Sequence, residues 1–277
     1  MFFIAGSGHC GTKWLSTVLT DQNSKVVCFH EGRHNLTGIT WEKAIEIQKA
    51  TGFDGFGDYF NKVLSLQNNQ GMKVGDSNSW SMETLCNEQK SQKLTKNISI
   101  DKVLFLIRNG IRTINSVIEL NKRIKGHTRL MNSQPAVKKQ WEDCVISWQE
   151  KNNISLEIDR RNDDWIATLP HLIYWAEGYS KSKLDVAKSI YGADFSIYRL
   201  EDLTTDIEFL GNLLQKFGIS KNSEEIKKLQ QRDVNRKVKN QDLDYIIKNW
   251  NNDLKNNFKK ICGDTMEYHG YDIGILE

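Results

Sequence analysis

The sequence predicts an α/β protein in which a central parallel β-sheet of about five strands is flanked by helices. Short apolar runs of strand length alternate along the chain with longer amphipathic stretches of helical period. Each apolar run is nearly continuous, as in strands that are buried on both faces of a parallel sheet. With 277 residues, of which 39% are hydrophobic, the chain can bury a sizeable core. We expect a single domain that spans residues 1–277.

The predicted elements alternate along the whole chain. The strands are the apolar runs at residues 2–5, 25–29, 72–74, 103–107 and 195–198. Apolar residues recur at helical spacing over residues 41–52, 59–66, 81–90, 111–124, 137–149, 171–191, 206–217, 223–231 and 243–262. Pro135 and Pro170 both stand at the start of a predicted helix, where proline is well tolerated. Residues 122–193 contain no convincing strand, so we expect a mostly helical insertion there.

The charge and the cysteines of the chain limit its partners and its compartment. Lysine and arginine total 38 and aspartate and glutamate 35, which leaves a net charge of only +3. This argues against a nucleic-acid partner, and no apolar run is long enough to span a membrane. The five cysteines never form a C-x-x-C pair, which favours free thiols in a reducing compartment. Because the first strand begins at residue 2, we expect no signal peptide and a cytoplasmic protein.

A glycine-rich loop separates the first predicted strand from the first helix. Gly6, Gly8 and Gly11 follow the strand at residues 2–5, and an amphipathic helical stretch follows the loop. A strand, a glycine loop and a helix in this order bind phosphate, because backbone N–H groups turn inward and the helix start carries partial positive charge. We therefore expect a phosphate- or sulfate-bearing ligand at this loop.

The loop does not fit a magnesium-dependent triphosphatase. Gly6 and Gly11 have the spacing of the pattern G-x-x-x-x-G-K-S/T, but the next residues, Thr12 and Lys13, stand in reversed order. A triphosphatase also needs an acid after a second strand to hold magnesium. The strand at residues 103–107 is followed instead by Arg108, which suits a second phosphate. The sequence therefore predicts two anion sites and no metal.

The end of the second predicted strand has two interpretations. His30, Glu31 and His34 match H-E-x-x-H, a zinc-site pattern that requires both histidines on one helix. The preceding residues are strand-like and Gly32 follows at once, which is poor helix chemistry. We therefore disfavour the zinc site, and the other interpretation, in which Glu31 acts as a base, comes from a family resemblance.

Two motifs indicate the same family of enzymes. Residues 9–15 read His-Cys-Gly-Thr-Lys-Trp-Leu, close to the pattern Lys/Arg-Ser-Gly-Thr-Thr/Ser-Trp-Leu. Arg108 directly follows a predicted strand, and Ser116 stands eight residues later. With residues 199–203 (Arg-Leu-Glu-Asp-Leu) and a late Gly-Tyr, these motifs resemble the sulfotransferases that use 3′-phosphoadenosine 5′-phosphosulfate. The resemblance is to the glutamate-base type, which includes carbohydrate and tyrosylprotein sulfotransferases, and it implies a P-loop nucleotide-hydrolase-like fold.

The resemblance also implies roles for individual residues. Glu31 corresponds to the general base that deprotonates the acceptor, and Lys13 adds positive charge at the reacting group. Arg108 and Ser116 correspond to the residues that hold the 3′-phosphate. The 5′-phosphosulfate would be held by the loop residues Gly8, His9, Cys10, Gly11, Thr12, Lys13 and Trp14. The chain departs from the family pattern at His9, where a lysine or arginine is usual, and at Leu200, where a tyrosine is usual.

The function implied is sulfuryl transfer from 3′-phosphoadenosine 5′-phosphosulfate to the hydroxyl group of an acceptor such as a carbohydrate. Adenosine 3′,5′-bisphosphate would be the second product. We expect residues 122–193 to form the region that faces the acceptor. Two alternatives remain: a nucleotide-dependent kinase of P-loop fold, and a catalytically weakened protein that keeps the nucleotide pocket. The identity of the acceptor and the oligomeric state stay open.

Overall fold

The computed structural model describes residues 1–30, 71–78, 82, 85–95, 99–124, 133–159, 164–232 and 242–276. The predicted helices at residues 41–52 and 59–66 lie outside these residues, and the one at 81–90 is described in part. The chain forms two compact units, each made of two stretches of sequence. The first unit contains Met1–Arg108 and Leu184–Asn235, and the second contains Asn109–Lys183 and Arg236–Glu277.

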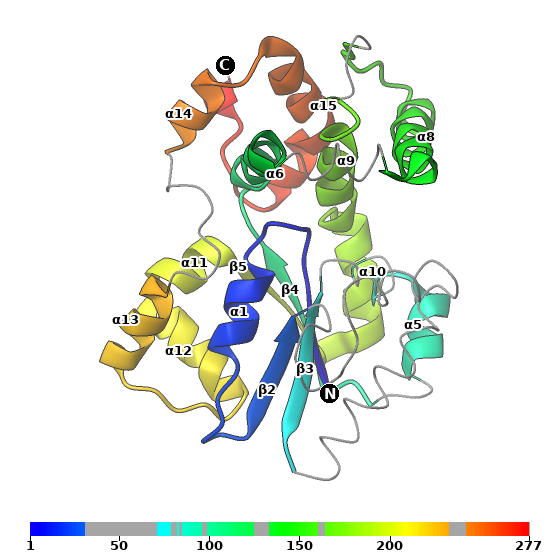
Figure 1. The fold of residues 1–277 in the computed structure, drawn as a ribbon. Coiled ribbons are helices and arrows are strands. Elements are labelled where there is room, and N and C mark those ends of the chain that lie inside the picture. The colour runs from blue at the N-terminus through cyan, green and yellow to red at the C-terminus, as the bar shows by residue number, and fades with distance from the viewer. Residues whose placement is uncertain are drawn as a thin grey trace. The chain divides into compact units, whose positions relative to one another are not determined.

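The first unit is built on a five-stranded parallel sheet with the strand order β2-β3-β1-β4-β5 (Figure 1). Its strands are β1 (Phe2–Ala5), β2 (Val26–His30), β3 (Lys73–Asn78), β4 (Lys102–Ile107) and β5 (Phe195–Arg199). All five predicted strands are confirmed, and β3 continues four residues beyond its predicted end. Because the strands are parallel, the residues that follow them meet at one edge of the sheet.

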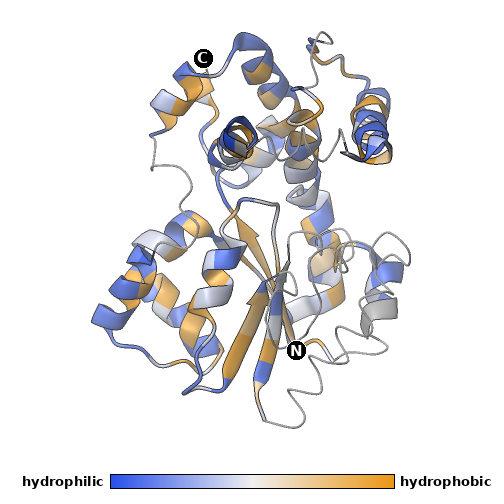
Figure 2. Cartoon of the chain, viewed as in Figure 1, coloured by the Kyte–Doolittle hydropathy of each residue, from blue (hydrophilic) through white to orange (hydrophobic). Residues whose placement is uncertain are grey.

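The centre of the sheet is apolar on both faces. All four residues of β1 are buried, as are the last five residues of β4, which explains their unbroken apolar sequence. Figure 2 shows the hydrophobic colour concentrated on β2 and β4. Gly75 on β3 has no room for a side chain, because a β-carbon there would collide with the ring of Phe2.

Several helices of the first unit share one hydrophobic core with the sheet. Leu15 of α1 (Thr12–Val18) and Leu213 of α12 (Ile207–Lys216) share a core with Ile226 of α13 (Ser223–Gln231) and Phe2 of β1. The sequence prediction missed the short helix α11 (Leu200–Thr205), which begins directly after β5. Helix α5 (Glu88–Thr95) is joined to α10 (Lys181–Tyr191) by a hydrogen bond between Ser91 and Tyr191.

The regular secondary structure in the described residues of the second unit is all helical. Its main helices are α6 (Gly110–Ile124), α8 (Pro135–Asn152), α9 (Leu169–Gly178), α14 (Leu243–Lys248) and α15 (Asn252–Tyr268). α6, α9 and α15 converge at Gly110, where a β-carbon would lie 3.1–3.2 Å from Met266, Phe258 and Trp175. Among the described residues, none of the helices combines the length and the apolar character that a membrane-spanning segment requires.

Two predicted helices are each divided in the structure. The stretch at 171–191 forms α9 and α10 with a break at Tyr179–Ser180, and the stretch at 243–262 forms α14 and α15. The second break follows from Asn251, whose side chain caps α15 by accepting a hydrogen bond from the Leu254 N–H. Pro135 and Pro170 stand in the first turns of α8 and α9, as predicted.

Candidate functional site

The glycine loop lies at the edge of the sheet where the parallel strands end. β1 ends at Ala5 and α1 begins at Thr12. In between, His9 and Gly11 have left-handed φ values of 67° and 91°, whereas Gly8 and the residue between them do not have positive φ. A backbone that alternates in this way turns successive N–H groups toward one side and forms a concavity for an anion. The loop therefore has a backbone geometry that suits a phosphate or sulfate group.

The loop is closely packed against its surroundings. A β-carbon on Gly6 would collide with the sulfur of Cys10, which is fully buried, and would lie 3.0 Å from the carbonyl oxygen of Leu106. A β-carbon on Gly11 would lie 2.8 Å from the methyl groups of Leu200, the first residue of α11. Glycine is thus required at both positions that share the spacing of a phosphate loop.

Arg108 is attached to this loop. It follows β4, and its Nη1 donates a hydrogen bond to the carbonyl oxygen of His9 at 3.0 Å. His9 is a non-glycine residue in the left-handed region, a conformation that persists only when the surroundings hold it. The structure thus brings together the two predicted anion-binding elements of the first unit, and the guanidinium restrains the strained loop residue.

Thr12 is held from two neighbouring strand ends. Its Oγ1 lies 3.2 Å from Nε2 of His30, the last residue of β2. Its carbonyl oxygen accepts a hydrogen bond of 3.0 Å from the hydroxyl of Ser77 on β3, which is the register partner of His30. The sequence prediction considered His30 only as a zinc ligand, which it disfavoured, and gave Ser77 no role. Their positions at two strand ends could have suggested one, because parallel strands end at the same edge.

The side chains of two predicted loop residues, Trp14 and Lys13, lie in different environments. The Trp14 side chain is buried, and its indole N–H donates to the carbonyl oxygen of Leu229 on α13 at 3.2 Å. Its ring therefore contributes to the core between α1 and α13. The Lys13 side chain is exposed at the first turn of α1.

Two predicted residues, Ser116 and Glu31, stay untested. Ser116 lies on α6 in the second unit, so its pairing with Arg108 stays a prediction. Glu31 lies outside the described residues and also stays a prediction. Lys73, the first residue of β3, lies at the opposite end of that strand and donates a hydrogen bond to the carbonyl oxygen of Phe217.

His30 does not stand in the helical setting that the zinc pattern at the second strand end requires. His30 is the last residue of a strand in register with β3, whereas the pattern requires it on a helix. Across the described part of the chain, no group of three or more histidine, cysteine or acidic side chains is arranged to hold a metal. All five cysteines are free thiols, and burial together with the nearby Asp76 raises the pKa of the Cys28 thiol well above its usual value.

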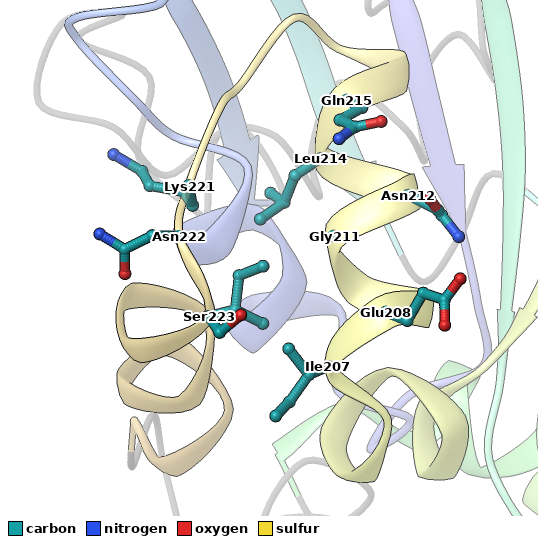
Figure 3. A pocket seen from close by; sticks show the side chains of 10 residues that line it. Ile207, Glu208, Gly211, Asn212, Leu214, Gln215, Lys221, Asn222 and Ser223 are labelled. Atoms are coloured by element: carbon teal, nitrogen blue, oxygen red, sulfur yellow. The ribbon is translucent and has the colours of Figure 1, made fainter.

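A separate hollow of about 450 Å³ lies between α12 and α13 (Figure 3). Gly211 and Ile226 approach each other closely in its wall. A β-carbon on Gly211 would lie 3.2 Å from Ile226 Cδ1. Its polar rim includes Asn222, which caps α13, and Lys221, which forms an ion pair of 2.6 Å with Asp21. These two polar groups of the rim thus already have partners within the protein, and the hollow contains none of the predicted site residues.

Comparison with known proteins gives one partial match in sequence. A family model described as "ATP synthase regulation protein NCA2" matches residues 184–267, less than a third of the chain. The matched stretch contains neither the glycine loop nor β1 to β4, so it does not assign the chain to that family. No curated protein matches the chain.

Comparison with solved structures gives matches along the whole chain. A crystal structure of a sulfotransferase from Alicyclobacillus acidocaldarius has a TM-score of 0.51 and 12% identity, over 99% of this chain and 97% of that one. The sulfotransferase domain of the Synechococcus PCC 7002 olefin synthase has a TM-score of 0.47 and 14% identity, over 98% and 94%. With its parallel sheet and its glycine loop between β1 and α1, the chain has a sulfotransferase-like α/β fold.

Proposed function

We propose that the chain transfers a sulfuryl group from 3′-phosphoadenosine 5′-phosphosulfate to the hydroxyl group of an acceptor such as a carbohydrate. The observation that carries this proposal is the loop at residues 8–11, whose φ values alternate in sign and whose His9 carbonyl is held by Arg108. This geometry suits an anion with oxygen atoms on several sides, and it occurs on a sulfotransferase-like fold.

The loop would bind the 5′-phosphosulfate of the donor. Backbone N–H groups from Gly8 to Trp14 supply most of the hydrogen bonds, because the first N–H groups of a helix have no partner within it. The Thr12 hydroxyl and the Lys13 ammonium add a donor and a positive charge. Arg108, already beside the loop, would hold the 3′-phosphate together with Ser116.

The reaction would proceed by direct transfer. The acceptor oxygen attacks sulfur, the bond between sulfur and the bridging phosphate oxygen breaks, and Glu31 takes the proton of the acceptor hydroxyl. General-base help of this kind is typically worth about 10²–10⁴ in rate. Lys13 would stabilise the negative charge that develops on the departing phosphate.

The free state of all five cysteines supports a reducing compartment such as the cytoplasm.

Calorimetric titration with adenosine 3′,5′-bisphosphate tests the donor site. We expect micromolar binding to the wild-type chain, and a loss of about tenfold or more in Arg108→Ala, since charged hydrogen bonds are removed. Arg123→Ala, which removes an exposed arginine on α6, is the matched control and should bind as the wild type does. A preference for ATP with Mg²⁺ would instead support a P-loop kinase.

Turnover of the donor in the presence of carbohydrate acceptors tests the chemistry. We expect Glu31→Gln to retain binding of adenosine 3′,5′-bisphosphate and to lose at least about a hundredfold in turnover. Glu88→Gln, on the exposed start of α5, is the control. Full turnover in Glu31→Gln would contradict the proposed base. Because His9 replaces the usual lysine or arginine, binding without any turnover by the wild-type chain would favour the weakened nucleotide-binding protein.

A further inference from the structure

We propose that His30 is a positioning residue that turns the Thr12 hydroxyl toward the oxyanion bound at the loop. The inference rests on the proposed function, because it concerns the same bound anion. It starts from the contact of 3.2 Å between His30 Nε2 and Thr12 Oγ1, which joins the end of β2 to the first residue of α1.

The position of Thr12 is fixed by contacts on three sides. Ser77 holds its carbonyl oxygen, and His30 lies against its hydroxyl. Its methyl group lies toward Gly6, because a β-carbon there would be 3.1 Å from Thr12 Cγ2. A β-branched side chain held in this way has one χ1 rotamer, and Thr12 is only 4% exposed. Only the direction of the Thr12 O–H bond can then still vary.

His30 decides that direction, because a hydroxyl has one hydrogen to donate. If Nε2 of His30 lacks a hydrogen, it accepts the hydroxyl hydrogen of Thr12, and Thr12 has nothing to donate to a ligand. If Nε2 carries a hydrogen, it donates to Oγ1, and the hydroxyl hydrogen turns toward another acceptor. A sulfate or phosphate oxygen at the loop is such an acceptor, so the bound state requires His30 with a hydrogen on Nε2.

Nitrogen-15 NMR of labelled histidine tests this directly in the full chain. The His30 signals are assigned by their loss in His30→Gln, and the spectrum is recorded with saturating adenosine 3′,5′-bisphosphate. We expect the Nε2 shift of His30 to be that of a nitrogen with a bound hydrogen. A shift typical of a nitrogen that lacks a hydrogen, in the saturated protein, would overturn the inference.

A double-mutant cycle measures the coupling between the two residues. We expect His30→Leu and Thr12→Val each to weaken binding of adenosine 3′,5′-bisphosphate by about tenfold, and His30→Leu to cost little more in a Thr12→Val background. His30→Gln should restore most of the affinity, since its amide N–H can donate to Thr12. Thr17→Val, which removes an exposed hydroxyl from the same helix, is the matched control and should change nothing.

The outcomes separate this inference from the proposed function. Wild-type protein that does not bind adenosine 3′,5′-bisphosphate would overturn both. If the wild-type protein binds it but the losses of affinity from His30→Leu and Thr12→Val simply add, the role of His30 is overturned and the proposed function stands. A packing role alone would give additive losses and no recovery in His30→Gln.

Discussion

Two glycines of the same loop have different tasks at the scale of single residues. Gly11 has a φ of 91° and faces the methyl groups of Leu200, whereas a β-carbon on Gly8 would meet nothing within 4 Å. A left-handed conformation costs an L-residue about 1–2 kcal/mol, and the contact with Leu200 adds to that cost. The two positions therefore form a matched pair for substitution by alanine.

We expect Gly11→Ala to lower the free energy of unfolding by about 2 kcal/mol, because it combines backbone strain with a steric clash. Gly8→Ala should change it by less than about 0.5 kcal/mol. Urea denaturation followed by circular dichroism measures both values. Leu200→Ala in the Gly11→Ala background should relieve the clash and leave the backbone cost. Equal effects of the two glycine substitutions would mean that the loop does not hold its left-handed conformation.

The sequence revealed some residues of the candidate site and missed others for a physical reason. The spacing of Gly6 and Gly11 is a local property of the chain, so it could be predicted. The contact of His30 with Thr12 depends on how β2 lies beside β3 and α1, which no local pattern contains. Trp14 matches a family motif and also has the helical spacing of a core residue, and its ring lies in the core.

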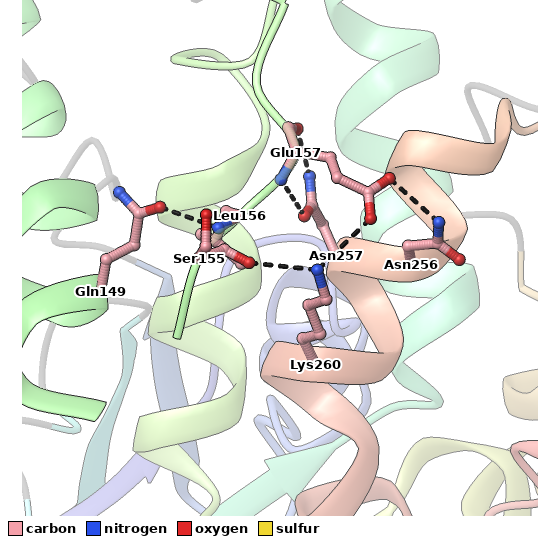
Figure 4. A network of polar contacts seen from close by, with 7 residues as sticks. All are labelled: Gln149, Ser155, Leu156, Glu157, Asn256, Asn257 and Lys260. Atoms are coloured by element: carbon pink, nitrogen blue, oxygen red, sulfur yellow. Dashed lines mark hydrogen bonds and ion pairs between the residues drawn. The ribbon is translucent and has the colours of Figure 1, made fainter. Parts of the chain in front are cut away.

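At the scale of elements, one buried side chain joins α15 to the segment that follows α8 (Figure 4). Asn257 accepts a hydrogen bond from the Glu157 N–H at 2.9 Å and donates to the Glu157 carbonyl oxygen at 2.7 Å. Asn256 donates to the carboxylate of Glu157 from the exposed side, and this bond, with help from Lys260, lowers the pKa of that carboxylate. Both asparagines thus bind Glu157. Asn257 bonds its backbone groups in the interior, and Asn256 bonds its carboxylate at the surface.

We expect Asn257→Ala to destabilise the protein by about 2 kcal/mol, because it removes two hydrogen bonds and leaves backbone groups without partners. Asn257 is only 2% exposed, so water cannot readily replace the lost bonds. Asn256→Ala removes an exposed hydrogen bond and should cost less than about 0.5 kcal/mol. Thermal unfolding of the two variants side by side measures the difference. A large loss of stability in Asn256→Ala and none in Asn257→Ala would contradict the greater contribution of the buried hydrogen bonds.

The strands were easier to predict from the sequence than the limits of the helices. Strands buried on both faces need unbroken apolar runs, so their sequence is distinctive. The apolar period of residues 171–191 continues through the break at Tyr179–Ser180, where the Ser180 hydroxyl bonds the carbonyl oxygen of Glu177. The short helix α11 carries too few residues to show a period at all.

At the scale of the whole molecule, segments far apart in the sequence build each unit. The boundary at Arg108 and Asn109 directly follows β4 and has no proline- or glycine-rich linker, so the sequence gives no sign of it. Within the first unit, Lys221 before α13 and Asp21 after α1 form an ion pair of 2.6 Å in which the Asp21 side chain is 10% exposed. The hydrogen bond with Lys221 lowers the pKa of Asp21 and raises the pKa of Lys221.

This ion pair predicts a dependence of stability on pH. The pKa of Asp21 is lower in the folded chain than the reference of about 3.9, so its contribution is complete above that value and is lost as the pH falls through the lowered pKa. We expect Asp21→Asn, which keeps the acceptor for the Ser24 N–H, to lower the free energy of unfolding by about 1 kcal/mol at pH 7. Urea denaturation between pH 7 and pH 2 should show this difference shrinking once the pH drops below about 3.9. Asp185→Asn, at an exposed position of α10, should show no such trend, and a difference for Asp21→Asn that stays constant down to pH 2 would contradict the electrostatic origin.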